Sequence, residues 1–146
     1  MNQLKLEELV IHHEGFRDTA YKCTEGHLTI GVGHKILPED NFKEGVVYNK
    51  EQLMAVFRTD LANAKFYANL LTKGWDIPEV AYNVIVSMIF QMGSHGVSKF
   101  KKFLDCVSKH DWKGAKFNGL DSRWAKQTPT RALELMNMLA ELEDRI

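Results

Sequence analysis

Three residues in the first third of the chain have side chains suited to acid–base chemistry at a shared site. Glu14 brings a carboxyl, while Cys23 and Thr29, nine and fifteen positions later, bring a thiol and a hydroxyl. A turn signal over residues 24–26 predicts that Cys23 and Thr29 lie on strands. These strands would lie beside the end of the helix that carries Glu14, which brings the three side chains toward one place.

Glu14 lies where an apolar helical stripe ends, next to Gly15. A helix C-terminus carries a partial negative charge, so it disfavours an anion there by about 0.3–1 kcal/mol. The carboxyl therefore needs a cation beside it or a proton of its own, and a general acid is a carboxyl that keeps its proton. The alternative interpretations are structural: a solvated surface glutamate, a cysteine buried as a small hydrophobe and a strand-forming threonine.

A metal site is a further interpretation, because His12 and His13 directly precede Glu14. Adjacent side chains of a helix are expected to point apart, and the HExxH spacing is absent, so we expect no metal. The two glycines around Val32 lack the third glycine of a dinucleotide-binding loop, so we expect no cofactor either. A metal-dependent hydrolase stays an alternative that a strong chelator tests.

The elements around these residues change type along the chain. The periodicity predicts a helix up to Gly15, a small sheet of two or three strands over residues 20–32 and a loop over 38–45. A long helix capped by Asn49 follows to about residue 71, and Asp76 is predicted to cap the next one. Further helices are predicted near 80–90, 97–108 and 111–118, and from 128 onward. The fold class is therefore α+β and mostly helical.

Length and composition set limits on function. The chain has 146 residues, of which 45% are hydrophobic and 26% charged, as expected of one globular domain. Its 19 basic and 19 acidic residues cancel, which gives no long-range attraction to nucleic acid or to a membrane surface. No leader sequence or membrane span is predicted, so we expect a cytoplasmic product and no membrane insertion. Cys106 is expected to be a buried, unreactive thiol that forms no disulfide with Cys23.

Several segments resemble the T-even phage lysozyme family, the muramidases of phage endolysins. The segments run in the family's order over essentially the whole chain: Glu14-Gly15-Phe16-Arg17, Thr29-Ile30-Gly31-Val32-Gly33-His34, Phe90-Gln91-Met92-Gly93, Gly96-Val97 with Phe100, and Ser122 to Ala132. The resemblance implies one lysozyme domain over 1–146. It has a small N-terminal lobe with a short antiparallel sheet at about 12–58, and a connecting helix at about 50–71. A larger helical lobe spans about 72–146 and includes the first helix, and a ligand cleft is expected between the lobes.

The resemblance also assigns roles to residues. Glu14, Cys23 and Thr29 match the catalytic positions, although the family more often has Asp where this chain has Cys23. Arg131 is implied to pair with Glu14, and His34 with Asp60. The substrate-contacting positions are Lys35, Phe90, Phe103 and Asn118, of which Lys35 and Phe103 depart from the family's pattern.

The implied reaction is hydrolysis of the β-1,4 bond between N-acetylmuramic acid and N-acetylglucosamine of bacterial peptidoglycan. Glu14 would protonate the leaving oxygen, and a water held by Thr29 and Cys23 would attack from the opposite face, giving inversion. Direct attack by a Cys23 thiolate, giving retention, and a fold that binds glycan without cutting it are the alternatives. The implied protein is a monomer in the host cytoplasm that needs a membrane-permeabilising partner, a holin, to reach the wall.

Overall fold

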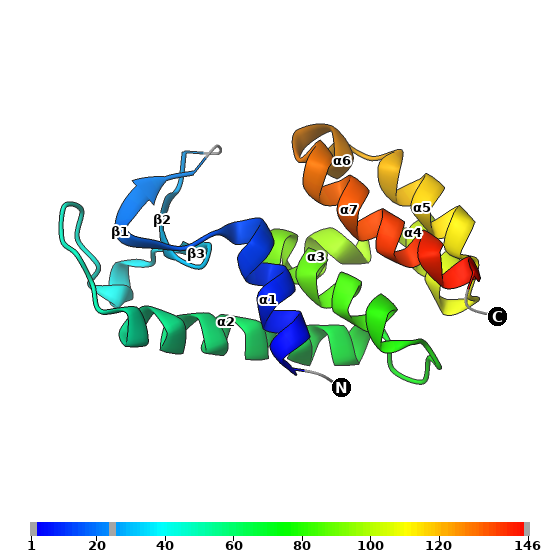
Figure 1. Cartoon of the computed structure of the whole chain (residues 1–146), viewed down its shortest axis with the longest axis horizontal. Coiled ribbons are helices and arrows are strands. Elements are labelled where there is room, and N and C mark those ends of the chain that lie inside the picture. Colours follow the sequence, from blue (N-terminus) through cyan, green and yellow to red (C-terminus); the bar gives the residue numbers. More distant parts are fainter. Residues whose placement is uncertain (1–2, 24–25, 145–146) are drawn as a thin grey trace. The chain divides into compact units, whose positions relative to one another are not determined.

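The computed structural model describes residues 3–23 and 26–144, and these form a mostly helical α+β fold with one small antiparallel sheet (Figure 1). The predicted fold class is confirmed. The chain divides into two compact units, residues 2–63 and residues 64–146, and the long helix α2 (Lys50–Leu71) contributes to both. The expected lobe boundaries, with the first helix counted in the C-terminal lobe, stay a prediction.

The first unit contains one helix, three strands and the beginning of α2. Helix α1 (Gln3–Glu14) ends where Gly15 takes a positive φ of 74° and its N–H donates to the Ile11 carbonyl at 2.7 Å. A glycine tolerates this left-handed conformation, which stops the helix directly after Glu14. The buried apolar side chains of this unit come from α1, the sheet and α2: Leu6, Val10, Ile30, Val32, Leu53, Phe57 and Leu61.

The sheet has the order β1 (Arg17–Lys22), β2 (Leu28–Gly31) and β3 (His34–Lys35), all antiparallel. Between the pairs Arg17↔Gly31 and Tyr21↔Thr29 the register shifts, so β1 carries an irregularity there. The Cys23 N–H donates to the His27 carbonyl at 2.9 Å, and this bond closes the hairpin. The predicted hairpin is therefore present, although Thr24 and Glu25 of its turn signal lie outside the described residues.

Helix α2 begins as predicted. The Asn49 side-chain oxygen accepts a hydrogen bond from the Glu51 N–H at 2.7 Å, which satisfies one of the donors that the first turn leaves unpaired. The segment before it, expected to be loop, contains a single turn of 3-10 helix, η1 (Pro38–Asp40). Pro38 fits the start of that turn because its missing N–H is not needed there.

The second unit is helical throughout its described length. Helix α3 (Glu79–Ser98) is followed by α4 (Lys101–Ser108), α5 (Trp112–Leu120), α6 (Arg123–Gln127), α7 (Pro129–Ala140) and a 3-10 turn, η2 (Glu141–Asp144). Helices α4 to α7 pack together (Figure 1). The first half of α3 is its buried part, since eight of the nine residues from Ala81 to Ile89 are buried, as the nearly uniform apolar pattern of this segment predicts.

Two local predictions in this unit are wrong, and one helix was missed. Pro78, with no side-chain hydrogen bond, occupies the cap position of α3, so Asp76 does not cap it. The helix expected over 97–108 is split, because α3 continues to Ser98 and α4 starts at Lys101. Helix α6 was not predicted. Its N-cap is Ser122, whose hydroxyl accepts from the Ala125 N–H at 3.2 Å, a capping signal that the sequence contains.

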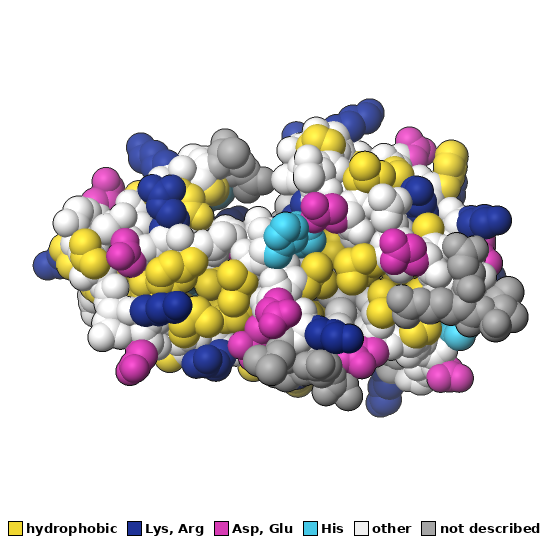
Figure 2. All heavy atoms as spheres, in the orientation of Figure 1, with side chains coloured by type: hydrophobic (Ala, Val, Ile, Leu, Met, Phe, Trp, Pro, Cys, Tyr) yellow, Lys and Arg dark blue, Asp and Glu magenta, His cyan; other side chains and the backbone are white. Residues whose placement is uncertain are grey.

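The surface agrees with the balanced composition. Lys and Arg side chains are interspersed with Asp and Glu side chains over the face shown in Figure 2. Among the described residues, no helix is both long enough and apolar enough to cross a membrane.

Candidate active site

The Glu14 carboxyl packs directly on the backbone of the β2–β3 turn. A side-chain Cβ placed on Gly33 would lie only 2.5 Å from Glu14 Oε1 and 2.8 Å from its carboxyl carbon. Gly33 also has a positive φ of 62°. This position therefore requires glycine for two reasons, and the close approach fixes where the half-buried Glu14 carboxyl lies.

The other two predicted catalytic residues meet at one backbone carbonyl. The His27 oxygen accepts from the Cys23 N–H at 2.9 Å and from the Thr29 hydroxyl at 3.1 Å. Thr29 is 3% exposed, whereas Cys23 is half-buried. Because the single Thr29 hydroxyl proton is used on this carbonyl, the hydroxyl oxygen can receive a further hydrogen bond only as an acceptor.

Tyr21 is a site residue that the sequence analysis did not single out. It lies on β1 directly opposite Thr29, and the Arg17 guanidinium carbon is 4.8 Å from its ring centre. Burial raises the pKa of the Tyr21 phenol above its ordinary value. The charges of Glu14 and Cys23 raise it further, while that of Arg17 opposes them. This coupling links Tyr21 electrostatically to Glu14 and Cys23. The sequence signal that could have identified Tyr21 is its place in an alternating strand pattern, two residues before Cys23.

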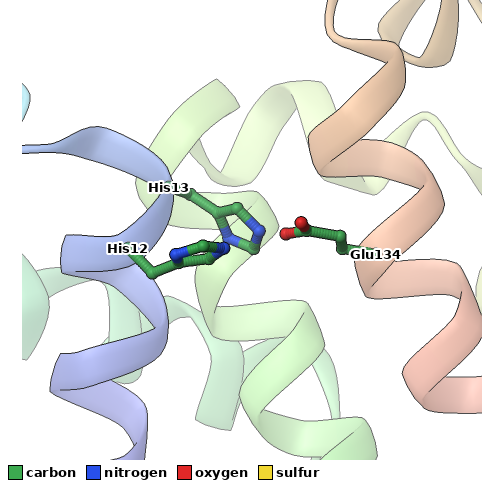
Figure 3. A group of neighbouring side chains, drawn as sticks. All are labelled: His12, His13 and Glu134. Atoms are coloured by element: carbon green, nitrogen blue, oxygen red, sulfur yellow. The ribbon is translucent and has the colours of Figure 1, made fainter.

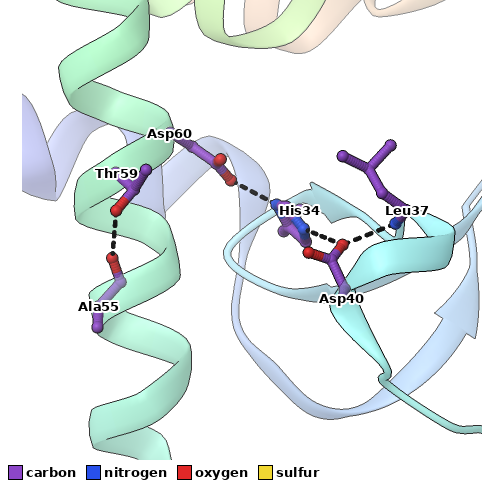
Figure 4. Close-up of polar contacts among 6 residues, drawn as sticks. All are labelled: His34, Leu37, Asp40, Ala55, Thr59 and Asp60. Carbon is purple, nitrogen blue, oxygen red and sulfur yellow. Dashed lines mark hydrogen bonds and ion pairs between the residues drawn. The ribbon is translucent and has the colours of Figure 1, made fainter.

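His34 is held between two carboxylates (Figure 4). Its Nδ1 lies 2.7 Å from Asp60 of α2, which is the pairing that the family resemblance implied, and its Nε2 lies 2.8 Å from Asp40 of η1. Asp40 also accepts from the Leu37 N–H at 2.7 Å. Both ring nitrogens face acceptors, so both donate only when the ring is protonated.

The charges around His34 agree with a protonated ring. The hydrogen bond to Asp60 raises the pKa of His34 to about 9, burial opposes this shift, and Asp40 adds to it. Burial of the Asp40 carboxyl acts to raise its pKa. The Leu37 N–H and His34 outweigh burial, so the net shift is downward. The sequence analysis missed Asp40, since nothing in the spacing indicates that η1 turns this carboxyl toward the ring.

Lys35 is an exposed residue of β3, in the same unit as Glu14, Cys23 and Thr29. The other predicted substrate-contacting residues and Arg131 belong to the second unit. Phe90 on α3 and Asn118 on α5 are half-buried, and Asn118 Nδ2 donates to the Gly114 carbonyl at 2.8 Å. Phe103 is 1% exposed and makes an edge contact with Phe100, so its ring has almost no surface to offer a sugar.

The Arg131 guanidinium is also buried. Its Nη2 donates to the Ser87 carbonyl at 3.3 Å and to the Ser87 hydroxyl at 3.2 Å, which tie α7 to α3. Pairing of Arg131 with Glu14 stays a prediction from the family resemblance.

Both cysteines are thiols. Cys106 is half-buried rather than fully buried as expected, and its sulfur accepts from Asn118 Nδ2 at 3.7 Å. Desolvation raises the pKa of this thiol, and the nearby Asp111 carboxylate raises it further. A thiol that resists ionisation is a weak nucleophile, so the structure gives Cys106 no reactive character.

The two histidines before Glu14 lie side by side at the end of α1 (Figure 3). Their ring centres are 4.9 Å apart with the rings tilted by 54°, so the expectation that the side chains point apart is wrong. Figure 3 also draws Glu134 of α7, a residue of the second unit. Because the direction of the two histidine side chains no longer argues against a metal, the metal-dependent interpretation is left to the chelator test.

Comparisons with known proteins point to one family. The phage lysozyme family matches this chain over residues 11–138. Probable T4-type lysozyme 2 of Dictyostelium discoideum is 27% identical over 159 aligned residues, which cover 91% of this chain and 92% of the relative. The Endolysin of Acyrthosiphon pisum secondary endosymbiont phage 1 is 29% identical, over 81% of this chain and 75% of the relative.

A third relative is much longer than this chain. The pre-baseplate central spike protein Gp5 of Enterobacteria phage T4 is 29% identical over 88% of this chain, but the match covers only 26% of that longer protein. A mostly helical chain with a small antiparallel sheet and a carboxyl held at the end of its first helix fits the class of lysozyme-type glycoside hydrolases. The chain belongs to the phage lysozyme family.

Proposed function

We propose that this protein is an endolysin-type muramidase that hydrolyses the β-1,4 bond between N-acetylmuramic acid and N-acetylglucosamine of peptidoglycan. The observation that carries the proposal is the placement of Glu14, whose carboxyl is set on Gly33 at the edge of the sheet. Cys23 and Thr29, bound to one carbonyl, belong to the same sheet. Family membership supports this interpretation because Glu14, Cys23 and Thr29 match the catalytic positions of the family resemblance.

In the proposed reaction Glu14 transfers its proton to the glycosidic oxygen as the bond from that oxygen to the anomeric carbon breaks. Water attacks the anomeric carbon from the opposite face and gives inversion, an arrangement that needs about 6.5–9.5 Å between the two catalytic groups. The Thr29 hydroxyl donates its proton in a hydrogen bond to the His27 carbonyl, so its oxygen accepts a hydrogen bond from this water. The water's lone pair is then directed away from Thr29.

In this scheme Cys23 accepts a hydrogen bond from the second water hydrogen. The proton that the water loses on attack passes to the Cys23 thiolate where that form is present and otherwise to solvent, and solvent reprotonates Glu14. An ordinary thiol has a pKa of about 8.5, so a neutral thiol predominates near pH 7 and is a poor base. The scheme therefore predicts slower turnover than a carboxylate at position 23 would give. The alternative, attack by a Cys23 thiolate on the sugar, gives retention of configuration, and analysis of the product anomer by NMR separates the two schemes.

The remaining roles follow the family resemblance. We propose that Lys35, Phe90 and Asn118 contact substrate and that Arg131 compensates the charge of Glu14, with His34 and Asp60 supporting the sheet. The substrate contact that the resemblance implies for Phe103 is not part of this proposal, because its ring is buried. We also propose that the protein acts as a monomer and reaches the wall from the host cytoplasm through a holin. Lysis on induction only when a holin is co-expressed tests this route.

The decisive experiment is clearing of purified peptidoglycan by the parent and by Glu14→Gln, with Glu39→Gln as matched control. Glu39 is an exposed glutamate of η1, so its amide variant carries the same charge change away from the site. We expect Glu14→Gln to abolish clearing with an unchanged circular dichroism spectrum, and Glu39→Gln to clear as the parent does. Full activity of Glu14→Gln refutes the assignment of the general acid.

A second function is favoured by one observation, the cysteine at position 23 where the family more often has a carboxylate. This function is binding of glycan without cleavage. A pull-down on insoluble peptidoglycan, run beside the clearing assay, discriminates between them. Retention on the pellet without release of soluble fragments supports binding alone.

A further inference from the structure

Tyr21 lies on the face of the sheet that carries the candidate site. It pairs with Thr29 across β1 and β2, and directly opposed residues of antiparallel strands project to the same face. Thr29 is the proposed water ligand, so the Tyr21 phenol reaches over the same part of the sheet. The Tyr21 side chain is half-buried, so part of its surface is exposed on this face.

Arg17 fixes the Tyr21 ring. Residues four apart on a regular strand are separated by about 13 Å, yet the Arg17 guanidinium carbon lies 4.8 Å from the ring centre. The irregularity of β1 between these two residues and the length of the arginine side chain make this approach possible. A cation over the face of a ring is attracted to it, so the ring has one preferred position.

The phenol keeps its proton and lies in the field of Glu14. Burial is the main reason that its pKa is raised, and Glu14 is the largest of the charged causes, ahead of Arg17 and Cys23. A protonated phenol is a hydrogen-bond donor, and Glu14 becomes a stronger acceptor when it gives up its proton. Among the charges that raise the pKa of Tyr21, Glu14 has a larger effect than Cys23, so Glu14 is the favoured partner of the phenol.

We propose that Tyr21 is a positioning residue whose phenol O–H holds and stabilises the Glu14 carboxylate as it forms during proton transfer. The inference rests on the proposed function. No bond to Tyr21 breaks: Glu14 gives its proton to the leaving oxygen, and the phenol O–H forms a hydrogen bond to the carboxylate as negative charge develops. The interaction is stronger in the transition state than in the ground state, so it acts on kcat.

The kinetic test compares Tyr21→Phe with Tyr67→Phe on a defined oligosaccharide of alternating N-acetylglucosamine and N-acetylmuramic acid. Tyr21→Phe keeps the ring and its contact with Arg17, while Tyr67 is 46% exposed on α2 in the second unit. Loss of one hydrogen bond to a charged group predicts a fall in kcat of about 10- to 100-fold with KM unchanged. A kcat of Tyr21→Phe within twofold of the parent overturns the proposal, because a ring that only packs is still present.

A second measurement does not depend on activity. The ring-carbon NMR titration of Tyr21 is followed in the parent and in Glu14→Gln, with the Tyr67 resonance as internal control. We expect the Tyr21 midpoint to fall in Glu14→Gln, because removal of a nearby negative charge makes phenolate formation easier. The Tyr67 midpoint should not change.

The two measurements separate the proposals. An inactive parent refutes the proposed function and the positioning role of Tyr21 with it. An active parent whose Tyr21 midpoint is the same with and without the Glu14 charge overturns the role of Tyr21 alone.

Discussion

Replacement of Gly33 by alanine should disable the site while leaving most of the fold intact. The added Cβ would lie 2.5 Å from Glu14 Oε1, whereas ordinary contacts begin near 3.4 Å, so the carboxyl must move by about 0.9 Å, the difference between these distances. A displacement of about 1 Å of a catalytic group can lower the rate by roughly 100-fold. We therefore expect Gly33→Ala to clear peptidoglycan about 100-fold more slowly than the parent.

The substitution also strains the backbone at position 33, and this loss of stability can be measured separately from the displacement of the carboxyl. Gly33 has a φ of 62°, and an alanine in the left-handed region costs about 1–2 kcal/mol. Gly31 provides a matched control, because it has nearly the same φ of 64° while its added Cβ would meet Leu53 at 3.4 Å, an ordinary contact. Gly31→Ala should therefore lose similar stability and retain most of its activity.

The assay is the initial rate of clearing at a temperature well below the melting transition of both variants, with urea unfolding to measure stability. Equal loss of activity in Gly31→Ala and Gly33→Ala would refute the reasoning, since backbone strain alone would then explain both.

Two further predictions concern ionisable groups. His34 has a pKa raised to about 9, so its interactions stabilise the protein fully below about pH 6.5, and this stabilisation is lost as the pH rises through 9. His34→Gln should lower the free energy of unfolding at pH 6 by about 1–3 kcal/mol, after allowance for partial solvent screening, and by much less at pH 10. Urea unfolding measures this, and an equal loss at both pH values contradicts the predicted linkage. Cys23→Asp should clear peptidoglycan faster than the parent at pH 6–7, because a carboxylate is ionised there and an ordinary thiol is not. Superposable pH–rate profiles of the two proteins would rule out a base role for the thiol.

The parts of the fold with strong local signals were predictable from the sequence. The stop of α1 at Gly15, the hairpin and the cap of α2 by Asn49 each depend on residues close in sequence. The errors arose where competing signals were close together. Asp76 is a good capping residue, but Pro78 two positions later has the extended backbone that the cap position of α3 needs.

The site was predictable only in its residue types. Glu14, Cys23 and Thr29 follow from the helix end, the hairpin and the family pattern. The sequence does not reveal that Thr29 and Cys23 share the His27 carbonyl, because that depends on the strand register. The approach of Asp40 to His34 was equally inaccessible, since it depends on the path of the chain through η1.

The position of α2 in the sequence has a consequence for synthesis on the ribosome. Glu14, Tyr21, Cys23 and Thr29 leave the exit tunnel well before Lys50, where α2 begins. A hairpin and one short helix are at best marginally stable alone in water. Leu53, which borders Gly31, and Asp60, which pairs with His34, both come from α2. The nascent chain therefore carries the proposed chemistry early, but the residues that hold it in place arrive only when α2 has been translated.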